Sequence, residues 1–221
     1  MALDLVIFDC DGVLVDSEPI VNRIESEFFA TVGFRADPLE VRRRFQGLTT
    51  DQVAAAVEAE TGRRFTADEL YSWGMMTALG LVESLGPVPG VRDVAEQLIA
   101  SGMAVCVASQ SPLPRVRLSL RVTHLAALFG ENVFTASMVA RPKPAPDLFL
   151  HAAQRMGAEP PRCVVIEDSP SGVRAACAAG MAAFGYAAEG GAGPDALAAA
   201  GAHVFTSMTE LPALLAAANH R

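Results

Sequence analysis

The sequence of 221 residues predicts an α/β protein whose parallel sheet carries an inserted helical domain. Two observations lead to this fold class. Short, continuously apolar runs alternate with amphipathic helical patterns along most of the chain, which is typical of a parallel sheet covered on both faces. The region from about Asp16 to Leu85 breaks the alternation, because it contains helical patterns and no strand-like run. We therefore expect a core of residues 1–15 and 88–221, and a helical domain over residues 16–87.

The elements follow in order along the chain. The first predicted strand is Leu5–Phe8, and the inserted region then shows helical patterns at Ile20–Val32, Thr50–Glu60 and Ala67–Leu81. The run Gly86-Pro87-Val88-Pro89-Gly90 marks the return to the core. The later predicted strands are Ala104–Ala108, Val133–Phe134, Cys163–Ile166, Met181–Phe184 and His203–Val204. The predicted helices between and after them are Val91–Ala100, Pro146–Met156, Pro170–Ala179 and Met208–Ala217, and Ala187–Gly193 is predicted as a surface loop.

Composition excludes several classes of function. The chain is 51% hydrophobic and 19% charged, as in an ordinary globular protein, and its formal charge of −8 disfavours a nucleic-acid partner, which would require a basic face. No apolar run approaches the roughly 20 residues of a transmembrane helix, and the N-terminus lacks the pattern of a signal peptide. The four cysteines show no CxxC spacing and are expected to be reduced, in a cytoplasmic protein without a membrane partner.

Polar clusters follow four of the predicted strands. In open α/β sheets, ligands bind beyond the carboxyl ends of the strands, so these clusters are expected to meet. In chain order they are Asp9 with Asp11, then Ser109-Gln110-Ser111, then Arg141-Pro142-Lys143-Pro144, and finally Glu167-Asp168-Ser169.

Four carboxylates at one sheet edge need a compensating cation. Like charges within about 4 Å repel by several kcal/mol, and hard carboxylate ligands suit Mg²⁺, which also bridges to phosphates. Lys143, the single lysine beside sixteen arginines, is a compact charge suited to a phosphoryl oxygen. Gly12 allows backbone amides to approach an anion, and Ser169-Pro170 predicts a helix start that points its positive end at the site.

Each cluster also has a structural interpretation. The aspartates and Ser109 fit turn positions, Lys143 fits a solvated loop, and Glu167-Asp168 fits helix caps. We favour one joint site, because four such coincidences would have to fall in order at four strand ends.

These segments resemble the motifs of the haloacid dehalogenase-like hydrolase superfamily, in its phosphatase and β-phosphoglucomutase-like branch with a helical cap. FDCDGVLVDSE resembles motif I, VASQS motif II, RPKPAPD motif III and IEDSPSGVRAACAAG motif IV. Gln110 departs from the Asn that relatives often carry in motif II. The resemblance implies a Rossmann-like core with an inserted α-helical cap, and a monomer.

The resemblance also implies roles for the site residues. Asp9 would attack phosphorus and form an aspartyl-phosphate, while Asp11 would serve as acid and then base, which calls for a raised pKa. Ser109 and Lys143 would hold the phosphoryl group. Mg²⁺ would be held by the Asp9 carboxylate, the Asp11 backbone carbonyl and Asp168, with Glu167 as a further ligand or as a support for one.

The stretch Phe45–Thr50, FQGLTT, resembles the substrate-specificity loop of such caps. Gln46, Gly47 and Thr50 are expected to face the leaving group, with Gly12 and Gln110 also in the substrate site. Val21 stands where β-phosphoglucomutases carry a His, and Thr50 lies near the place of their cap arginine, so a mutase is disfavoured.

The leading hypothesis is a Mg²⁺-dependent phosphatase of small phosphorylated metabolites, with sugar phosphates expected. The alternatives left open are a phosphosugar mutase and, outside enzymes, a phosphate-binding regulator or phospho-receiver module. A receiver would lack the helical insert and the Asp-x-Asp of this form.

Overall fold

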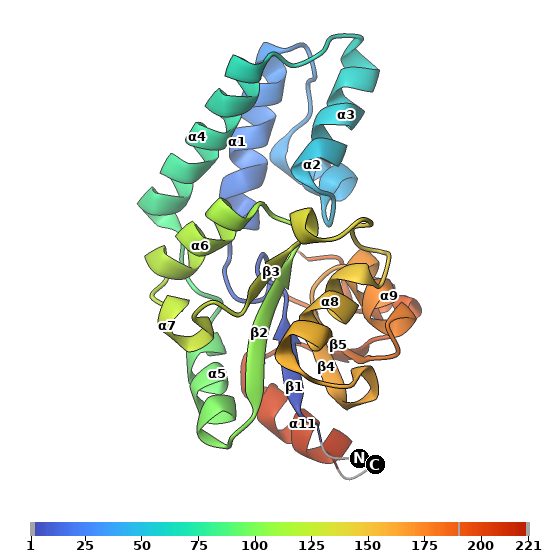
Figure 1. Cartoon of the computed structure of the whole chain (residues 1–221). Helices are drawn as coiled ribbons and strands as arrows, with labels where there is room; N and C mark the ends of the chain where they lie inside the picture. Colours follow the sequence, from blue (N-terminus) through green and yellow to red (C-terminus); the bar gives the residue numbers. More distant parts are fainter. Residues whose placement is uncertain (1–2, 190, 220–221) are drawn as a thin grey trace.

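The structure, a computed structural model, describes residues 3–189 and 191–219. Its centre is a six-stranded sheet in the order β3-β2-β1-β4-β5-β6, with every neighbouring pair parallel (Figure 1). The strands are β1 Leu5–Phe8, β2 Ala104–Ser109, β3 Val133–Thr135, β4 Cys163–Glu167, β5 Ala182–Tyr186 and β6 His203–Phe205. The predicted α/β fold class is confirmed.

Helices cover both faces of the sheet, as the continuously apolar strands predict. Val6 and Phe8 of β1 point to one face and pack with α5 (Val91–Ala100), α6 (Leu113–Val122), α7 (Ala126–Phe129) and α11 (Leu211–Asn219). Leu5 and Ile7 point to the other face and pack with α8 (Asp147–Met156), α9 (Pro170–Ala178) and α10 (Pro194–Ala200). The alternation of side chains along β1 therefore supplies two separate apolar cores.

The helical insert lies beyond the carboxyl ends of the strands, at the top of Figure 1. It consists of α1 Glu18–Thr31, α2 Pro38–Phe45, α3 Thr50–Thr61 and α4 Ala67–Ser84. These helices share their own aromatic core, in which Phe29 contacts Phe34, Phe45 and Trp73 edge-on. This aromatic cluster is separate from the apolar clusters of the sheet, whereas Val21 of α1 and Leu81 of α4 pack with the core.

The two crossings between insert and sheet run side by side. Val15 pairs with Pro87 in an antiparallel bridge, the Asp16 amide donates to the Gly86 carbonyl at 3.0 Å, and the Val88 amide donates to the Leu14 carbonyl at 3.0 Å. The two connections are therefore hydrogen-bonded to each other where they leave the core.

Several elements differ from their predicted extents. Helices α2, α6, α7 and α10 were not predicted, and β2 to β6 each run one or more residues further than expected at the carboxyl end. The predicted helix Met208–Ala217 is a 3₁₀ turn, Met208–Glu210, followed by α11. Part of the predicted loop Ala187–Gly193 lies outside the described residues. Within the residues that the structure describes, no helix is both long enough and apolar enough to cross a membrane.

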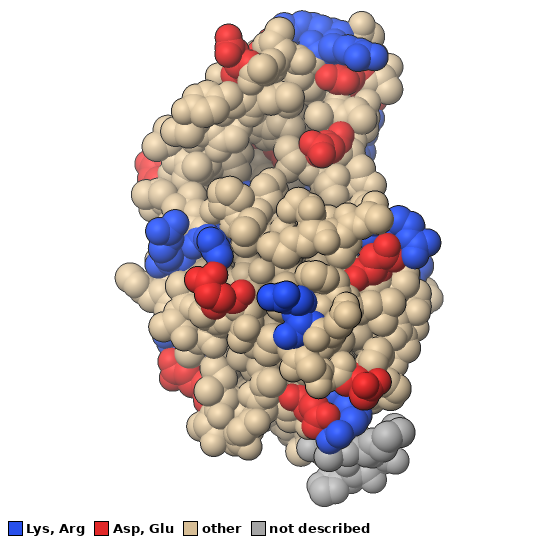
Figure 2. All heavy atoms as spheres, viewed as in Figure 1, with Lys and Arg blue, Asp and Glu red and all other residues tan. Residues whose placement is uncertain are grey.

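Charged side chains of both signs are interspersed on the face of the molecule drawn in Figure 2. Many of them pair locally, as Arg117 does with Glu131 at 2.6 Å and Arg141 with Asp147 at 2.8 Å. Exposed pairs of this kind contribute little to stability and are the ordinary pattern of a solvated surface.

Candidate active site

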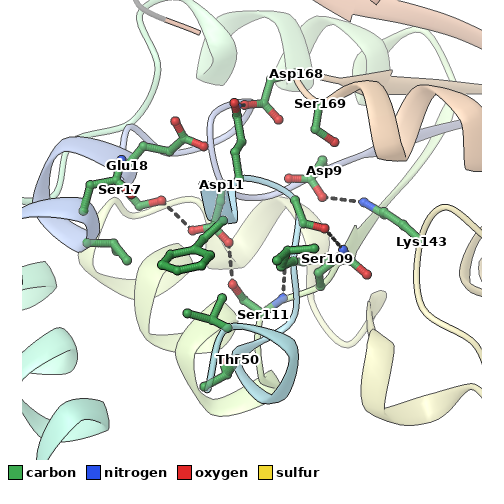
Figure 3. A pocket seen from close by; sticks show the side chains of 18 of the residues that line it. Asp9, Asp11, Ser17, Glu18, Thr50, Ser109, Ser111, Lys143, Asp168 and Ser169 are labelled. Atoms are coloured by element: carbon green, nitrogen blue, oxygen red, sulfur yellow. Dashed lines mark hydrogen bonds and ion pairs between the residues drawn. The ribbon is translucent and has the colours of Figure 1, made fainter. Parts of the chain in front are cut away.

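The strand ends bring the predicted side chains together under the helical insert. Asp9 follows β1, Ser109 ends β2 and Glu167 ends β4, and their order in the sheet places β1 between the other two. Figure 3 shows Asp9, Asp11, Ser109, Lys143 and Asp168 arranged around one pocket. These residues, with Glu167, Gln46, Gly47, Thr50 and Gln110, line a cavity of about 100 Å³. Gly12 is not among the lining residues.

Lys143 lies between two carboxylates. Its Nζ donates to Asp9 Oδ1 and to Glu167 Oε1, both at 2.6 Å, and to the Ala108 carbonyl at 3.0 Å. Its side chain is 1% exposed, so it is not the solvated loop lysine of the alternative interpretation. Burial alone would lower the pKa of Lys143, but Asp9 and Glu167 outweigh burial and raise it. The ammonium group is therefore a permanent charge that fixes both carboxylates.

Glu167 has both side-chain oxygens engaged. Oε1 accepts from Lys143, and Oε2 accepts from the Asp168 and Ser169 amides at 3.1 and 3.0 Å and from the Ser169 hydroxyl at 2.8 Å. Ser169 in turn caps α9 by accepting from the Gly172 amide at 3.1 Å. A glutamate with this set of donors orients Lys143 and the start of α9.

Asp168 is a buried carboxylate with few groups nearby to offset its negative charge. It is 6% exposed and accepts from Gln46 Nε2 at 3.1 Å. Burial, with Glu18, Glu167 and Asp9 nearby, raises its pKa well above the ordinary value. Gly12 has φ +80°, and any Cβ there would collide with the Asp168 carboxylate, so the glycine makes room for it.

The site around Asp9 carries surplus negative charge. Burial raises the pKa of Asp9 from 3.8 to about 8, an effect that Lys143 partly offsets and Glu167 and Asp11 reinforce. Raised values at both Asp9 and Asp168 indicate a place where a cation would be stabilised. In the described part of the chain, no group of three or more His, Cys, Asp or Glu side chains is arranged to hold a metal ion.

Asp11 is held by three donors. The Ser17 hydroxyl and Arg115 Nη2 donate to Oδ1 at 2.5 and 3.0 Å, and the Ser111 hydroxyl donates to Oδ2 at 2.6 Å. Burial would raise the pKa of Asp11, but Arg115 and the two hydroxyls outweigh it and lower the pKa. The expectation of a raised pKa is therefore wrong for this arrangement, because it omitted Arg115, which sits on the unpredicted helix α6.

The loop before α3 joins the insert to the core. Gln46 reaches Asp168, Gln110 Nε2 donates to the Gly47 carbonyl, and the Ser171 hydroxyl donates to the same carbonyl at 3.4 Å. Gly47 has φ +77°, which allows its carbonyl this close approach to the core. Gln46 and Gly47 thus contact core residues as well as the cavity, while Thr50 lies on its wall at the start of α3.

Besides Glu18 at the start of α1, two charged residues in the cavity wall were not predicted as site residues. Arg115 comes from α6, and Glu25 comes from the middle of α1 and is 7% exposed. Neither belongs to a motif, and the only available signal was a charged residue within an otherwise apolar helical stripe.

The chain matches a model of a protein family and resembles several proteins of known activity. The sequence model of the haloacid dehalogenase-like hydrolase family matches residues 3–180. The 6-phosphogluconate phosphatase of Escherichia coli K12 is 29% identical over 187 residues, which are 85% of this chain and 84% of that protein. The fructose-1-phosphate phosphatase YqaB of the same strain is 33% identical over 181 residues, 80% of this chain and 92% of that one.

A solved structure extends the likeness to nearly the full length. A haloacid dehalogenase family hydrolase from Deinococcus radiodurans R1, crystallised with bound phosphate and sodium, has a TM-score of 0.78 and 36% identity. The match covers 98% of this chain and 96% of that one.

Proposed function

This chain belongs to the haloacid dehalogenase-like hydrolase family and is a phosphoric monoester hydrolase, and we propose that it is a Mg²⁺-dependent phosphatase of sugar phosphates that works through an aspartyl-phosphate on Asp9. The observation that carries the mechanism is the buried chain Asp9–Lys143–Glu167, with 2.6 Å at each step. It places a fixed cation against one oxygen of a carboxylate that faces the cavity.

The donor set fits Mg²⁺. Asp9 and Asp168 are buried carboxylates whose raised pKa values indicate uncompensated charge. We propose that both, with the Asp11 backbone carbonyl, would hold the ion, while Glu167 supports Lys143 instead of ligating. Mg²⁺ commonly takes one or two carboxylates and keeps several waters, so a third side chain is not required. When bound, it would neutralise negative charge on the phosphoryl group.

The proposed reaction has two chemical steps, and Asp9 and Asp11 act in both. In the first, an Asp9 carboxylate oxygen forms a bond to phosphorus and the bond to the leaving oxygen breaks, with Asp11 donating a proton to that oxygen. In the second, water attacks phosphorus, the Asp9–phosphorus bond breaks, and Asp11 accepts the water's proton. Lys143 and the buried Ser109 hold the phosphoryl group in both steps.

Arg115, Ser111 and Ser17 lower the pKa of Asp11 and so favour its ionised form. Ionised Asp11, held by Ser17, Ser111 and Arg115, is already the form that accepts a proton from water. Donation in the first step requires that Asp11 first takes up a proton from solvent, which releases it from Arg115, and then turns toward the leaving oxygen. We propose that Arg115 stabilises the ionised form between the two steps.

Residues 16–87 are proposed as a cap that closes over the substrate. A cavity of about 100 Å³ is well below the roughly 300–1,000 Å³ of small-molecule pockets, so it suits a phosphoryl group and not a whole sugar phosphate. An adjoining hollow of about 390 Å³ between α4 and α6 shares Thr50 and Arg115 with it. We propose that the sugar occupies the boundary of the two, or enters when the insert opens.

The alternatives fare less well. A phospho-receiver is set aside because the chain is a hydrolase. For a mutase, the relevant observation is that Val21 lines the cavity wall where mutases place a His, and that none of the described residues lining the cavity is a histidine.

The test is release of inorganic phosphate from fructose 1-phosphate and a hexitol phosphate, with Mg²⁺ and after its removal by a chelator. We expect sustained turnover that falls by at least about a hundredfold on chelation and returns when Mg²⁺ is added back. Turnover that is unchanged by chelation would overturn the metal assignment, and formation of an isomeric sugar phosphate without phosphate release would favour the mutase.

A further inference from the structure

Glu25 is an unpaired carboxylate inside the cavity. It lies on α1, is 7% exposed and lines the same cavity as Asp9 and Asp11. Among the described residues, its side chain makes no hydrogen bond or ion pair. Burial raises the pKa of Glu25 to about 7, and the positive charge of Arg115 partly offsets this rise. Burying such a group without a partner destabilises a fold, so a ligand that supplies donors is the natural compensation.

Arg115, which faces Glu25, already pairs with another carboxylate, and so does Arg42 of the insert. Arg42 Nη2 lies 2.5 Å from Glu18 Oε2, and Arg115 Nη2 lies 3.0 Å from Asp11 Oδ1. Each guanidinium is therefore matched by one carboxylate. Glu25 is the acidic group left over on the insert's side of the cavity, so the surface that meets the leaving group has an excess of negative charge.

The position of Glu25 points to the leaving group and not to the phosphoryl group. The phosphoryl site is built from the strand ends and Lys143, whereas Glu25 comes from the insert and faces Arg115. Arg115 also lines the hollow between α4 and α6, which Figure 2 shows as an opening in this face of the molecule. A leaving group that extends from phosphorus toward this hollow passes Arg115, which Glu25 faces.

We propose that Glu25 determines specificity by accepting hydrogen bonds from a leaving group that carries hydroxyl or amine donors, and by repelling one that carries a carboxylate. Two carboxylates about 4 Å apart repel by several kcal/mol at the effective dielectric of a partly buried site. A hydroxyl in the same place instead supplies a donor that Glu25 lacks. The inference rests on the proposed phosphatase function, and it deepens that function by excluding sugar acids.

The competing explanation is purely structural. Glu25 would then serve only as a second countercharge for Arg115, and its removal would change the rate for every substrate by the same factor. Discrimination between substrates that differ in a single group separates the two explanations.

The experiment measures kcat/KM for a hexitol 6-phosphate and for 6-phosphogluconate, which differ at one carbon that is a hydroxymethyl group or a carboxylate. Both are assayed at pH 8 with Mg²⁺ for the wild type, for Glu25→Gln and for the control Glu27→Gln. Glu27 lies on the same helix and pairs with Arg23 at 3.3 Å on the solvent side. The control thus makes the same chemical change outside the cavity.

We expect the wild type to prefer the hexitol phosphate by at least about a hundredfold, and Glu25→Gln to reduce that ratio by at least about tenfold. Glu27→Gln should leave the ratio as it is. A smaller reduction in Glu25→Gln, or a wild type that prefers 6-phosphogluconate, overturns the inference. If the wild type releases phosphate from neither compound nor from an aryl phosphate, the proposed function itself fails, and the two failures are thereby distinguished.

Discussion

Lys143 shows how one side chain can organise a site. Its ammonium holds Asp9 and Glu167 at equal distances of 2.6 Å and lies 4.8 Å from the Phe149 ring. A guanidinium has the same charge but is planar and larger, and the chain uses arginine at every other basic position. A compact ammonium is thus the group that this buried position accommodates.

We predict that Lys143→Arg lowers kcat/KM by about a hundredfold or more, equivalent to about 2.7 kcal/mol of transition-state stabilisation, because the planar group cannot hold both carboxylates in place. The control is Arg141→Lys in the same loop, where the side chain is 70% exposed and pairs with Asp147. Steady-state kinetics on one sugar phosphate compares them. Equal, small effects in both variants would mean that the compact ammonium of Lys143 is not required for catalysis.

Glu25 links stability to pH. Its pKa is raised from 4.5 to about 7 on folding, so the folded state holds the proton more tightly than the unfolded state. The stabilising contribution is complete below about pH 4.5 and is lost as pH rises to about 7. We predict that Glu25→Gln raises the free energy of unfolding at pH 8 by about 1–3 kcal/mol relative to wild type, and by less at pH 5.

Urea denaturation at the two pH values measures this difference, with Glu27→Gln as the control on the exposed face of α1. A Glu25→Gln variant that is less stable than wild type at pH 8 would mean that the charged form has a partner in the folded protein.

Residues were predictable from sequence where a motif places them. Asp9, Ser109, Lys143 and Asp168 follow strands whose order in the sheet makes their ends meet, and all four line the cavity. Glu25 and Arg115 were not predicted, because each lies in a helix, α1 of the insert or α6 of the core, whose orientation toward the site is set by tertiary packing. The pKa of Asp11 was expected in the wrong direction for the same reason.

At the scale of elements, α9 fixes the position of Glu167 at the edge of the candidate site. Ser169 caps it, Glu167 accepts from the backbone at its start, and Gly172 lies in its first turn. A Cβ on Gly172 would overlap the Glu167 carboxylate. The helix can begin this close to β4 only because that residue has no side chain.

We predict that Gly172→Ala destabilises the protein by about 1–3 kcal/mol, although alanine is ordinarily the better helix residue by about 1 kcal/mol. Displacement of Glu167 should also move Lys143 and lower kcat/KM. The control is Gly74→Ala in α4, where an added Cβ meets no atom within 4 Å and should stabilise slightly. Thermal unfolding compares the two, and stabilisation by Gly172→Ala would contradict the packing described.

Helices α2 and α6 were not predicted, and the reason can be identified for each. Helix α2 contains Arg42-Arg43-Arg44, a charge run that hides its apolar face of Val41 and Phe45. In the fold Arg42 pairs with Glu18 and Arg44 pairs with Glu60, both within the insert. Helix α6 begins among the prolines of Pro112-Leu113-Pro114, which read as a loop. In both cases tertiary packing outweighed the local pattern.

At the scale of the whole molecule, the insert and the core together line one cavity. The core contributes Asp9, Lys143 and Asp168, which would hold what all phosphate esters share, and the insert contributes Glu25 and Gln46, which would meet what varies among them. The paired crossings at Val15 and Pro87 connect the two parts. Because the two sets of residues are separate, substitutions in the insert would change leaving-group specificity without altering the phosphoryl chemistry.

The central claim is that Asp9 carries the phosphoryl group. The most direct measurement is kcat/KM for phosphate release from fructose 1-phosphate by Asp9→Asn and by wild type, at saturating Mg²⁺, with thermal unfolding to verify that the variant is folded. An amide cannot form the acyl-phosphate, so the account predicts a loss of at least about a thousandfold in a folded protein. Activity of Asp9→Asn within about tenfold of wild type would contradict the covalent mechanism.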